Sequence, residues 1–171
     1  LAKKPGIHVE ETTGPLHYTF PMLMDVEPFN DNNVRLALKY ALNREEMLKL
    51  ILKGHGTVGK DNPIGPSYRY YSKELEPIPY DPEKAKFYLK KAGLSELSVK
   101  LSAADAAFAG AVDAAVLYKE HAAKAGINIE VVRESNDGYW SSVWLKKPWC
   151  ACYWGGYATE ELMFSTGYSA G

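Results

Sequence analysis

The chain has 171 residues, enough for one domain with a substantial buried core, and its composition of 46% hydrophobic and 24% charged residues is typical of a folded globular protein. Its formal net charge of -1, with lysines and acidic residues interspersed, provides no basic surface for nucleic-acid phosphates. Disordered, fibrous and nucleic-acid-binding classes are therefore excluded, and no apolar run reaches the roughly 18 residues that a membrane span needs.

Both ends of the chain look internal to a longer protein. Residues 1–6 contain neither an initiator methionine nor the apolar core of a signal peptide, and residues 165–171 follow an expected helix without any closing element. We therefore expect the chain to be a fragment.

Two strands and a helix are predicted in the first 41 residues. Apolar residues alternate with a period of two at 7–11 and 18–24, and Pro21 favours an edge position for the second strand. The next apolar residues recur with helical spacing, with Asn32 or Asn33 as the N-cap.

Two further helices flank a long loop. Asn43 with Glu46 three residues later is typical of a capping box, which predicts a second helix that ends at Gly54. Gly and Pro residues and a tyrosine cluster at 68–71 then predict an ordered loop over 54–79, a kind of segment that is often functional. Asp81 followed by a proline predicts the N-terminus of the third helix.

The remainder of the chain is typical of a βαβαβ unit. Strands are predicted at 97–102, 127–131 and 149–154, and helices at 110–125 and 136–145. A right-handed crossover makes such strands parallel, so three parallel strands are expected.

Topology alone predicts where a ligand would bind. In open parallel sheets the site lies beyond the carboxyl ends of the strands, so the loops 103–109 and 155–159 should share one rim. Asp105, in the first of these loops, is therefore a candidate ligand contact, although a cap for the following helix explains it equally well. Asn62, in the long loop, either reaches the cleft or starts a turn.

The two cysteines favour a structural role. Cys150 and Cys152 lie two residues apart in an apolar run, where neighbours rarely form a disulfide, and the four histidines are scattered singly, which offers no metal-site spacing. Buried, unreactive thiols are the expected result.

Several motifs in the same order resemble the peptide/nickel-type (family 5) extracytoplasmic solute-binding proteins, which serve ABC importers. These motifs are PFNDNNVRLAL at 28–38, ALNREE at 41–46, YDPEKA at 80–85 and AGI at 125–127, followed by a helix that contains Trp140. The resemblance covers essentially the whole chain. It implies an α/β fold, lobe II of a type II periplasmic-binding-protein fold, in which a mixed sheet with a βαβαβ C-terminal half is flanked by helices.

The same resemblance implies a set of residues near the ligand: Trp154, Gly155, Gly156, Tyr157 and Trp140. Each has a structural alternative. The tryptophans could pack in a core, and the glycines could form a tight turn that needs positive φ. Glu160 and Glu161 follow Thr159, so a position at a helix N-terminus accounts for them without catalysis.

One position departs from the family. Peptide binders follow the tryptophan of this strand with an acidic residue that pairs with the peptide ammonium, whereas no carboxylate occurs here before Glu160. A buried ammonium without a partner would be strongly unfavourable, so a free peptide amino terminus loses its expected contact.

Residues 1–171 are thus expected to form a single ligand-binding lobe whose first lobe is absent from the chain. The partners implied are a small-molecule solute, the missing first lobe and an ABC permease, with no cofactor, no metal and a periplasmic or extracytoplasmic location. Two alternatives remain open. One is an enzyme that uses Cys150 or Cys152 as a nucleophile with a histidine, and the other is a protein-interaction domain.

Overall fold

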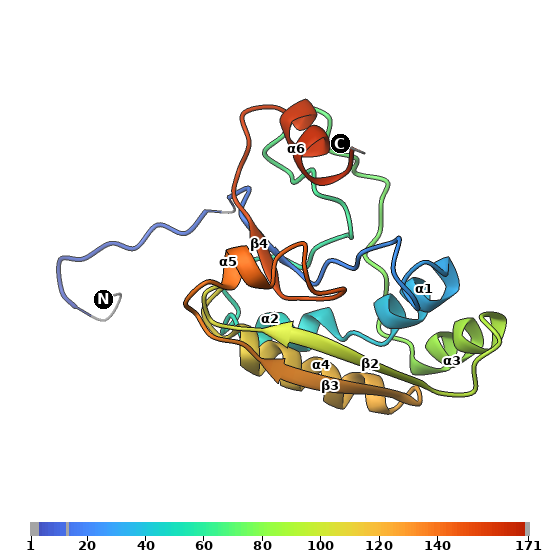
Figure 1. Ribbon diagram of the computed structural model, residues 1–171. Helices are drawn as coiled ribbons and strands as arrows, with labels where there is room; N and C mark the ends of the chain where they lie inside the picture. Colours follow the sequence, from blue (N-terminus) through green and yellow to red (C-terminus); the bar gives the residue numbers. More distant parts are fainter. Residues whose placement is uncertain (1–3, 13, 170–171) are drawn as a thin grey trace.

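The computed structural model describes residues 4–12 and 14–169 of the chain (Figure 1). In chain order the elements are β1 (His17–Thr19), α1 (Asn32–Tyr40), α2 (Arg44–Leu50), α3 (Pro82–Lys91), β2 (Leu97–Ala103), α4 (Ala111–Ala123), β3 (Ile127–Arg133), α5 (Tyr139–Ser142), β4 (Cys152–Trp154) and α6 (Glu160–Gly167). Within the described part of the chain, no helix is long and apolar enough to cross a membrane.

The βαβ unit β2–α4–β3 forms as predicted. β2 and β3 pair in parallel from Leu97 opposite Ile127 to Ala103 opposite Arg133, and α4 packs against both strands (Figure 1). The residues of α4 that face the strands are mostly alanines, and small side chains let a helix lie close to a sheet. Together with α1 and α3, which pack on each other, this unit forms the main core.

The third strand of the predicted sheet is reduced to one parallel bridge, between Ser102 and Cys150. The Ser102 amide donates to the Trp149 carbonyl (3.1 Å), and the Ala151 amide donates to the Ser102 carbonyl (2.9 Å). The chain then runs into β4, which pairs antiparallel with β1. The expectation of three full parallel strands was therefore wrong, because the stretch 149–154 divides its pairing between β2 and β1. The described chain has two two-stranded sheets, β2–β3 (parallel) and β1–β4 (antiparallel), linked by this single bridge.

The predicted strand at 7–11 is absent from the structure. All five residues are exposed and none is assigned to a strand or a bridge, so alternation of side chains there is not accompanied by burial. The strand predicted at 18–24 is confirmed only as β1 and an isolated antiparallel bridge between Met22 and Trp149.

Helix starts follow the predicted chemistry with one shift. Asn43 accepts a hydrogen bond from the Glu46 amide (3.1 Å), and Asp81 caps α3 by accepting from the Lys84 amide (2.8 Å). The N-cap of α1 is Asp31, not Asn32 or Asn33, because the Asp31 carboxylate accepts from the Asn33 amide at 2.7 Å. An ionised carboxylate is the stronger acceptor at a helix N-terminus.

α5 is much shorter than the helix predicted at 136–145. Gly138 precedes it in the left-handed conformation (φ 74), and the Asn136 side chain accepts from the Ala106 amide (2.9 Å) instead of capping a helix. Leu145 also has positive φ, which ends any helical continuation. The Asn136 contact ties the loop after β3 to the loop after β2.

Candidate functional site

The two faces of the β1–β4 pair differ in what covers them. His17 lies opposite Trp154 and Thr19 opposite Cys152, so these four side chains share one side, which we call the Trp154 face. The Trp144 ring packs edge-on against Trp154, with centroids 5.5 Å apart. A Cβ added at Gly167 of α6 would lie 3.1 Å from the Trp154 ring, so the end of α6 also closes over this face.

The segment after β4 contains Gly155, Gly156 and Tyr157, which the family resemblance implies to lie near the ligand. Neither glycine has positive φ, so the tight-turn explanation was wrong. Gly155 has open space around its Cα, whereas a Cβ on Gly156 would overlap the ring of Pro15. Close approach of the chain before β1 is the physical reason for glycine at position 156.

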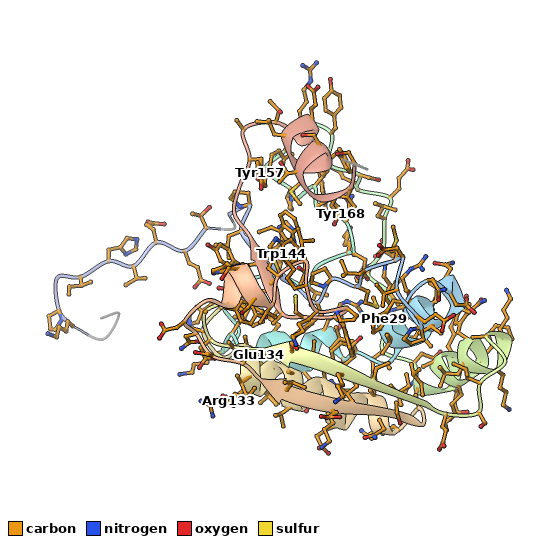
Figure 2. The ribbon with its side chains drawn as sticks, in the orientation of Figure 1. Phe29, Arg133, Glu134, Trp144, Tyr157 and Tyr168 are labelled. Carbon is orange, nitrogen blue, oxygen red and sulfur yellow. The ribbon has the colours of Figure 1, made fainter. Side chains whose placement is uncertain are left out.

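Tyr68, from the loop between α2 and α3, clamps this segment. Its hydroxyl donates to the Tyr157 carbonyl (2.8 Å) and accepts from the Tyr157 amide (2.9 Å). Next to it, the Tyr70 amide donates to the Glu160 carboxylate (3.1 Å). Figure 2 shows Tyr157 above Trp144, on the strand of chain that rises from β4 to α6. The tyrosine cluster is visible in the sequence, but no local pattern predicts this contact between residues that are 89 positions apart.

Replacing Tyr68 by phenylalanine should loosen the clamp without unfolding the chain. Both hydrogen bonds to Tyr157 are lost, and each contributes about 0.5–1.5 kcal/mol. We expect the Tyr157 amide to exchange with deuterium roughly ten times faster or more, while the free energy of global unfolding changes by less than about 1 kcal/mol. Tyr70→Phe is the matched control, since the Tyr70 side chain is 70% exposed. Equal exchange in both variants would contradict the clamp.

The opposite face of β1–β4 carries Tyr18 and Tyr153. Tyr18 stacks on Phe108 (centroids 4.3 Å apart), and Trp140 meets Tyr153 edge-on at 5.3 Å. Trp140 is 41% exposed there. The structure therefore does not bring Trp140 and Trp154 together, because Tyr153 and Trp154 are consecutive residues of a strand and point to opposite sides.

Asp105 and Asn62 lie apart from the Trp154 face. Asp105 is exposed and does not cap α4, which begins after Gly110, so the capping explanation was wrong. Asn62 accepts a hydrogen bond from the Ile64 amide (3.0 Å), which confirms the turn. Among the described residues no hydrogen bond or ring contact joins the loops 103–109 and 155–159, and Figure 1 shows the chain after β4 rising away toward α6. The shared rim therefore stays a prediction.

The acidic side chains nearest in sequence to the segment are already engaged. Thr159 caps α6 through its hydroxyl, and Glu160 stands in the first turn of that helix while binding the Tyr70 amide. In the parts of the chain that the structure describes, no ion pair involves a residue of the Trp154 face. The face thus carries the Trp154 ring, the His17 imidazole, the Thr19 hydroxyl and the Cys152 thiol.

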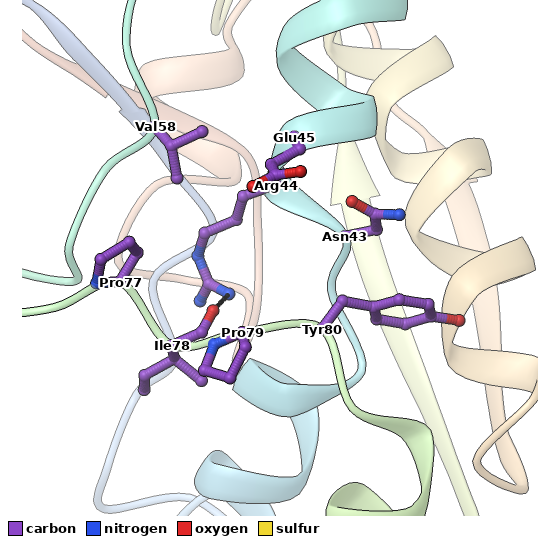
Figure 3. A pocket seen from close by; sticks show the side chains of 8 residues that line it. All are labelled: Asn43, Arg44, Glu45, Val58, Pro77, Ile78, Pro79 and Tyr80. Carbon is purple, nitrogen blue, oxygen red and sulfur yellow. Dashed lines mark hydrogen bonds between the residues drawn. The ribbon is translucent and has the colours of Figure 1, made fainter.

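A separate cavity of about 350 Å³ lies between α2 and the end of the long loop (Figure 3). Arg44 is its only guanidinium, and Figure 3 shows this side chain reaching Ile78. Arg44 donates to the carbonyls of Lys39 (3.0 Å) and Ile78 (3.2 Å), and its second amino group binds both oxygens of Asp61 (2.8 and 3.1 Å). Because these donors are occupied, the cavity offers no free cation for an anionic ligand.

Both thiols are buried and remain protonated at neutral pH. Burial raises the pKa of Cys150 to about 11 and that of Cys152 to about 12. A reactive cysteine needs a lowered pKa, so these values argue against the nucleophile alternative. No group of three or more metal-ligating side chains was found in the described residues.

Alkylation tests the state of the thiols. At pH 8 iodoacetamide should modify the folded chain roughly a hundredfold more slowly than the chain in denaturant, because a thiol of raised pKa supplies that much less thiolate. The number of labelled cysteines is read by mass spectrometry. Rapid labelling of the native chain at neutral pH would contradict the buried, protonated state.

Comparison with known proteins places the whole sequence in one group. Residues 1–170 match the model for the middle part of family 5 of the bacterial extracellular solute-binding proteins. A dipeptide-binding protein of Escherichia coli K12 is 38% identical over 96 residues, which are 56% of this chain and 16% of that protein. A glutathione-binding protein of Pectobacterium atrosepticum is 34% identical over 93 residues, 54% of this chain and 18% of that protein.

Solved structures agree with these relatives. The periplasmic binding protein DppA of Helicobacter pylori, in complex with the peptide STSA, superposes with a TM-score of 0.80 at 26% identity and covers 91% of this chain and 30% of its own. AgaA of A. tumefaciens R10, in complex with agropinic acid, gives 0.81 at 22% identity and covers 95% and 34%. The chain therefore spans about a third or less of the length of the proteins that it matches.

Proposed function

Because the chain belongs to family 5 of the bacterial extracellular solute-binding proteins, we propose that the protein of which it is part captures a small organic solute and delivers it to an ABC permease. The fold is part of the type II periplasmic-binding-protein fold. In the proposal, residues 1–171 form one lobe, a first lobe outside this chain forms the other wall of the cleft, and closure of the two lobes buries the solute. The protein would work outside the cytoplasm and catalyse no reaction.

The match of the family model to residues 1–170 is the observation that carries this proposal. It is supported by a candidate contact surface that consists of the Trp154 ring, Gly155, Gly156 and Tyr157. An aromatic face supplies contact area at little entropic cost, and Gly155, which has open space beside its Cα, allows close approach to the backbone. The Tyr68 clamp keeps this segment in one position, which reduces the cost of ordering it on binding.

The ligands named for relatives differ widely. They include dipeptides and glutathione among the curated relatives, and agropinic acid and a nickel–histidine complex among the solved structures. The present chain lacks a carboxylate between Trp154 and Thr159. We therefore propose an opine or another small organic solute whose recognition does not depend on a free ammonium, or a peptide held through its other groups.

Calorimetry on the full-length protein tests the proposal, with dipeptides, opines, sugars and polyamines as probes. We expect at least one to bind, and Trp154→Ala to weaken that binding tenfold or more. Trp140→Ala is the matched control, because Trp140 lies on the opposite face of β1–β4. Failure of every probe would overturn the proposed function. Loss of binding in Trp140→Ala alone would move the site to the other face.

A further inference from the structure

Two polar atoms of β1 are buried without a hydrogen-bond partner. They are His17 Nε2 and Thr19 Oγ1, which are the buried side-chain nitrogen and oxygen atoms that lack a partner in the described part of the chain. Nearly all buried polar groups in proteins are hydrogen-bonded, so each exception needs a reason. Two exceptions on one face of one three-residue strand point to a common cause.

The environment of His17 defines what its free nitrogen can accept. Nδ1 lies 3.2 Å from the Pro15 carbonyl oxygen. A carbonyl only accepts hydrogen bonds, so Nδ1 carries a proton, and in the tautomer whose single proton lies on Nδ1 the Nε2 atom presents a lone pair. The partner that Nε2 lacks is an N–H or O–H donor.

Thr19 completes the arrangement. The Thr19 hydroxyl lies close enough to the Cys152 thiol to favour the thiolate form of that thiol. No hydrogen bond of ordinary distance and angle to a described residue, however, is made by the Thr19 hydroxyl oxygen. A hydroxyl can both donate and accept. His17 and Thr19 point to the same side of β1 as Cys152 and Trp154, so the two unpaired atoms flank the side chains of the Trp154 face.

We propose that His17 and Thr19 recognise a neutral hydroxyl or carboxamide group of the solute, next to the Trp154 ring. The proposal rests on the proposed function and names the solute chemistry for that same site. A hydroxyl or carboxamide donates to Nε2 and accepts from Thr19, so one ligand group satisfies both atoms. A carboxylate would place a second lone pair against Nε2, and an ammonium would find no counter-charge on this face.

The burial of both atoms has a consequence for access. The end of α6 covers the Trp154 face at Gly167, and the contact consists of a residue without a side chain against the indole edge. A solute that binds His17 and Thr19 while it packs against this edge of the Trp154 ring would displace this end of α6. Until then the two groups remain unpaired, which disfavours the solute-free arrangement.

The test uses the full-length protein, with agropinic acid, D-galactose and the dipeptide Met-Leu as probes. Thr19→Val keeps the shape of the side chain and removes the unpaired hydroxyl. It should weaken binding of a hydroxyl- or amide-bearing probe roughly tenfold while leaving the melting temperature of the solute-free protein unchanged or higher. If Thr19 had only a structural role, Thr19→Val would instead lower the melting temperature of the solute-free protein. His17→Phe, which removes the free acceptor, should weaken the same probe by a similar factor.

Tyr18→Phe is the matched control, because it removes a hydroxyl from the other side of the same strand and keeps the ring that stacks on Phe108. Its dissociation constants should equal those of the unchanged protein. If the unchanged protein binds a probe and both Thr19→Val and His17→Phe bind it with the same dissociation constant, this inference is overturned and the proposed function stands. Failure of the unchanged protein to bind any of the wider set of solutes overturns the proposed function, and this inference with it.

Discussion

Replacing Arg44 by methionine should destabilise the chain by about 3 kcal/mol, one of the two largest effects expected of a single substitution here. Only 13% of the Arg44 side chain and 23% of the Asp61 side chain are exposed, so removal of the guanidinium leaves a largely desolvated carboxylate with only the more distant Lys39 ammonium (3.9 Å) beside it. It also frees carbonyl groups of Lys39 and Ile78 that Arg44 holds. Chemical denaturation measures the loss as a lower midpoint at unchanged slope.

Two controls separate charge from geometry. Arg133→Met removes an exposed arginine and should change the free energy of unfolding by less than about 0.5 kcal/mol. Arg44→Lys keeps the charge but loses the planar fork that binds both oxygens of Asp61, so its cost should be intermediate. Equal stability of Arg44→Met and Arg133→Met would show that the Arg44 contacts contribute nothing.

The second large effect is expected for Trp149→Ala, at about 3–5 kcal/mol. Trp149 is 1% exposed and contacts the rings of Phe29 (centroids 5.8 Å apart) and Tyr118 (5.3 Å), so truncation leaves a cavity between these two rings. Its Nε1 also donates to the Phe20 carbonyl at 3.0 Å, and that acceptor would remain unpaired. Thermal and denaturant unfolding give the two readouts.

A smaller substitution and an exposed tryptophan provide the comparison for Trp149. Trp149→Phe retains most of the volume and should cost less than Trp149→Ala. Trp140→Ala, on the exposed side of Tyr153, should cost less than about 1 kcal/mol. If Trp140→Ala lowered the free energy of unfolding as much as Trp149→Ala, the assignment of Trp149 to the core and of Trp140 to the exposed side would be wrong.

Sequence was sufficient where a local rule determines the structure. Caps and prolines act within one turn, so the starts of α2 and α3 were predicted to the residue through Asn43 and Asp81. The parallel pair β2–β3 followed from strands that alternate with a helix. Residues 7–11 have the same alternation but no sheet to pair with, which shows that a periodic pattern predicts a strand only where a partner covers one side.

The candidate site was predicted less well, because its parts are brought together by contacts that are distant in sequence. Trp154 and Tyr157 were identified from resemblance, but the hydroxyl that holds Tyr157 belongs to Tyr68, and no local pattern relates the two. Trp140 was grouped with Trp154 because the family resemblance implies that both lie near the ligand. Pairing of β4 with β1 decides which side each faces, and that pairing was not foreseen. The same pairing brings His17 to Trp154.

The stretch from Trp149 to Trp154 pairs with β2 at Cys150 and with β1 from Cys152 onward. The number of residues between these two pairings is therefore fixed. Insertion or deletion of one residue between these two anchors would turn Tyr153 toward α6 and Trp154 toward Trp140, exchanging the two aromatic surfaces without changing composition. We expect natural variation in this segment to consist of substitutions, with insertions and deletions confined to the loops on either side of it.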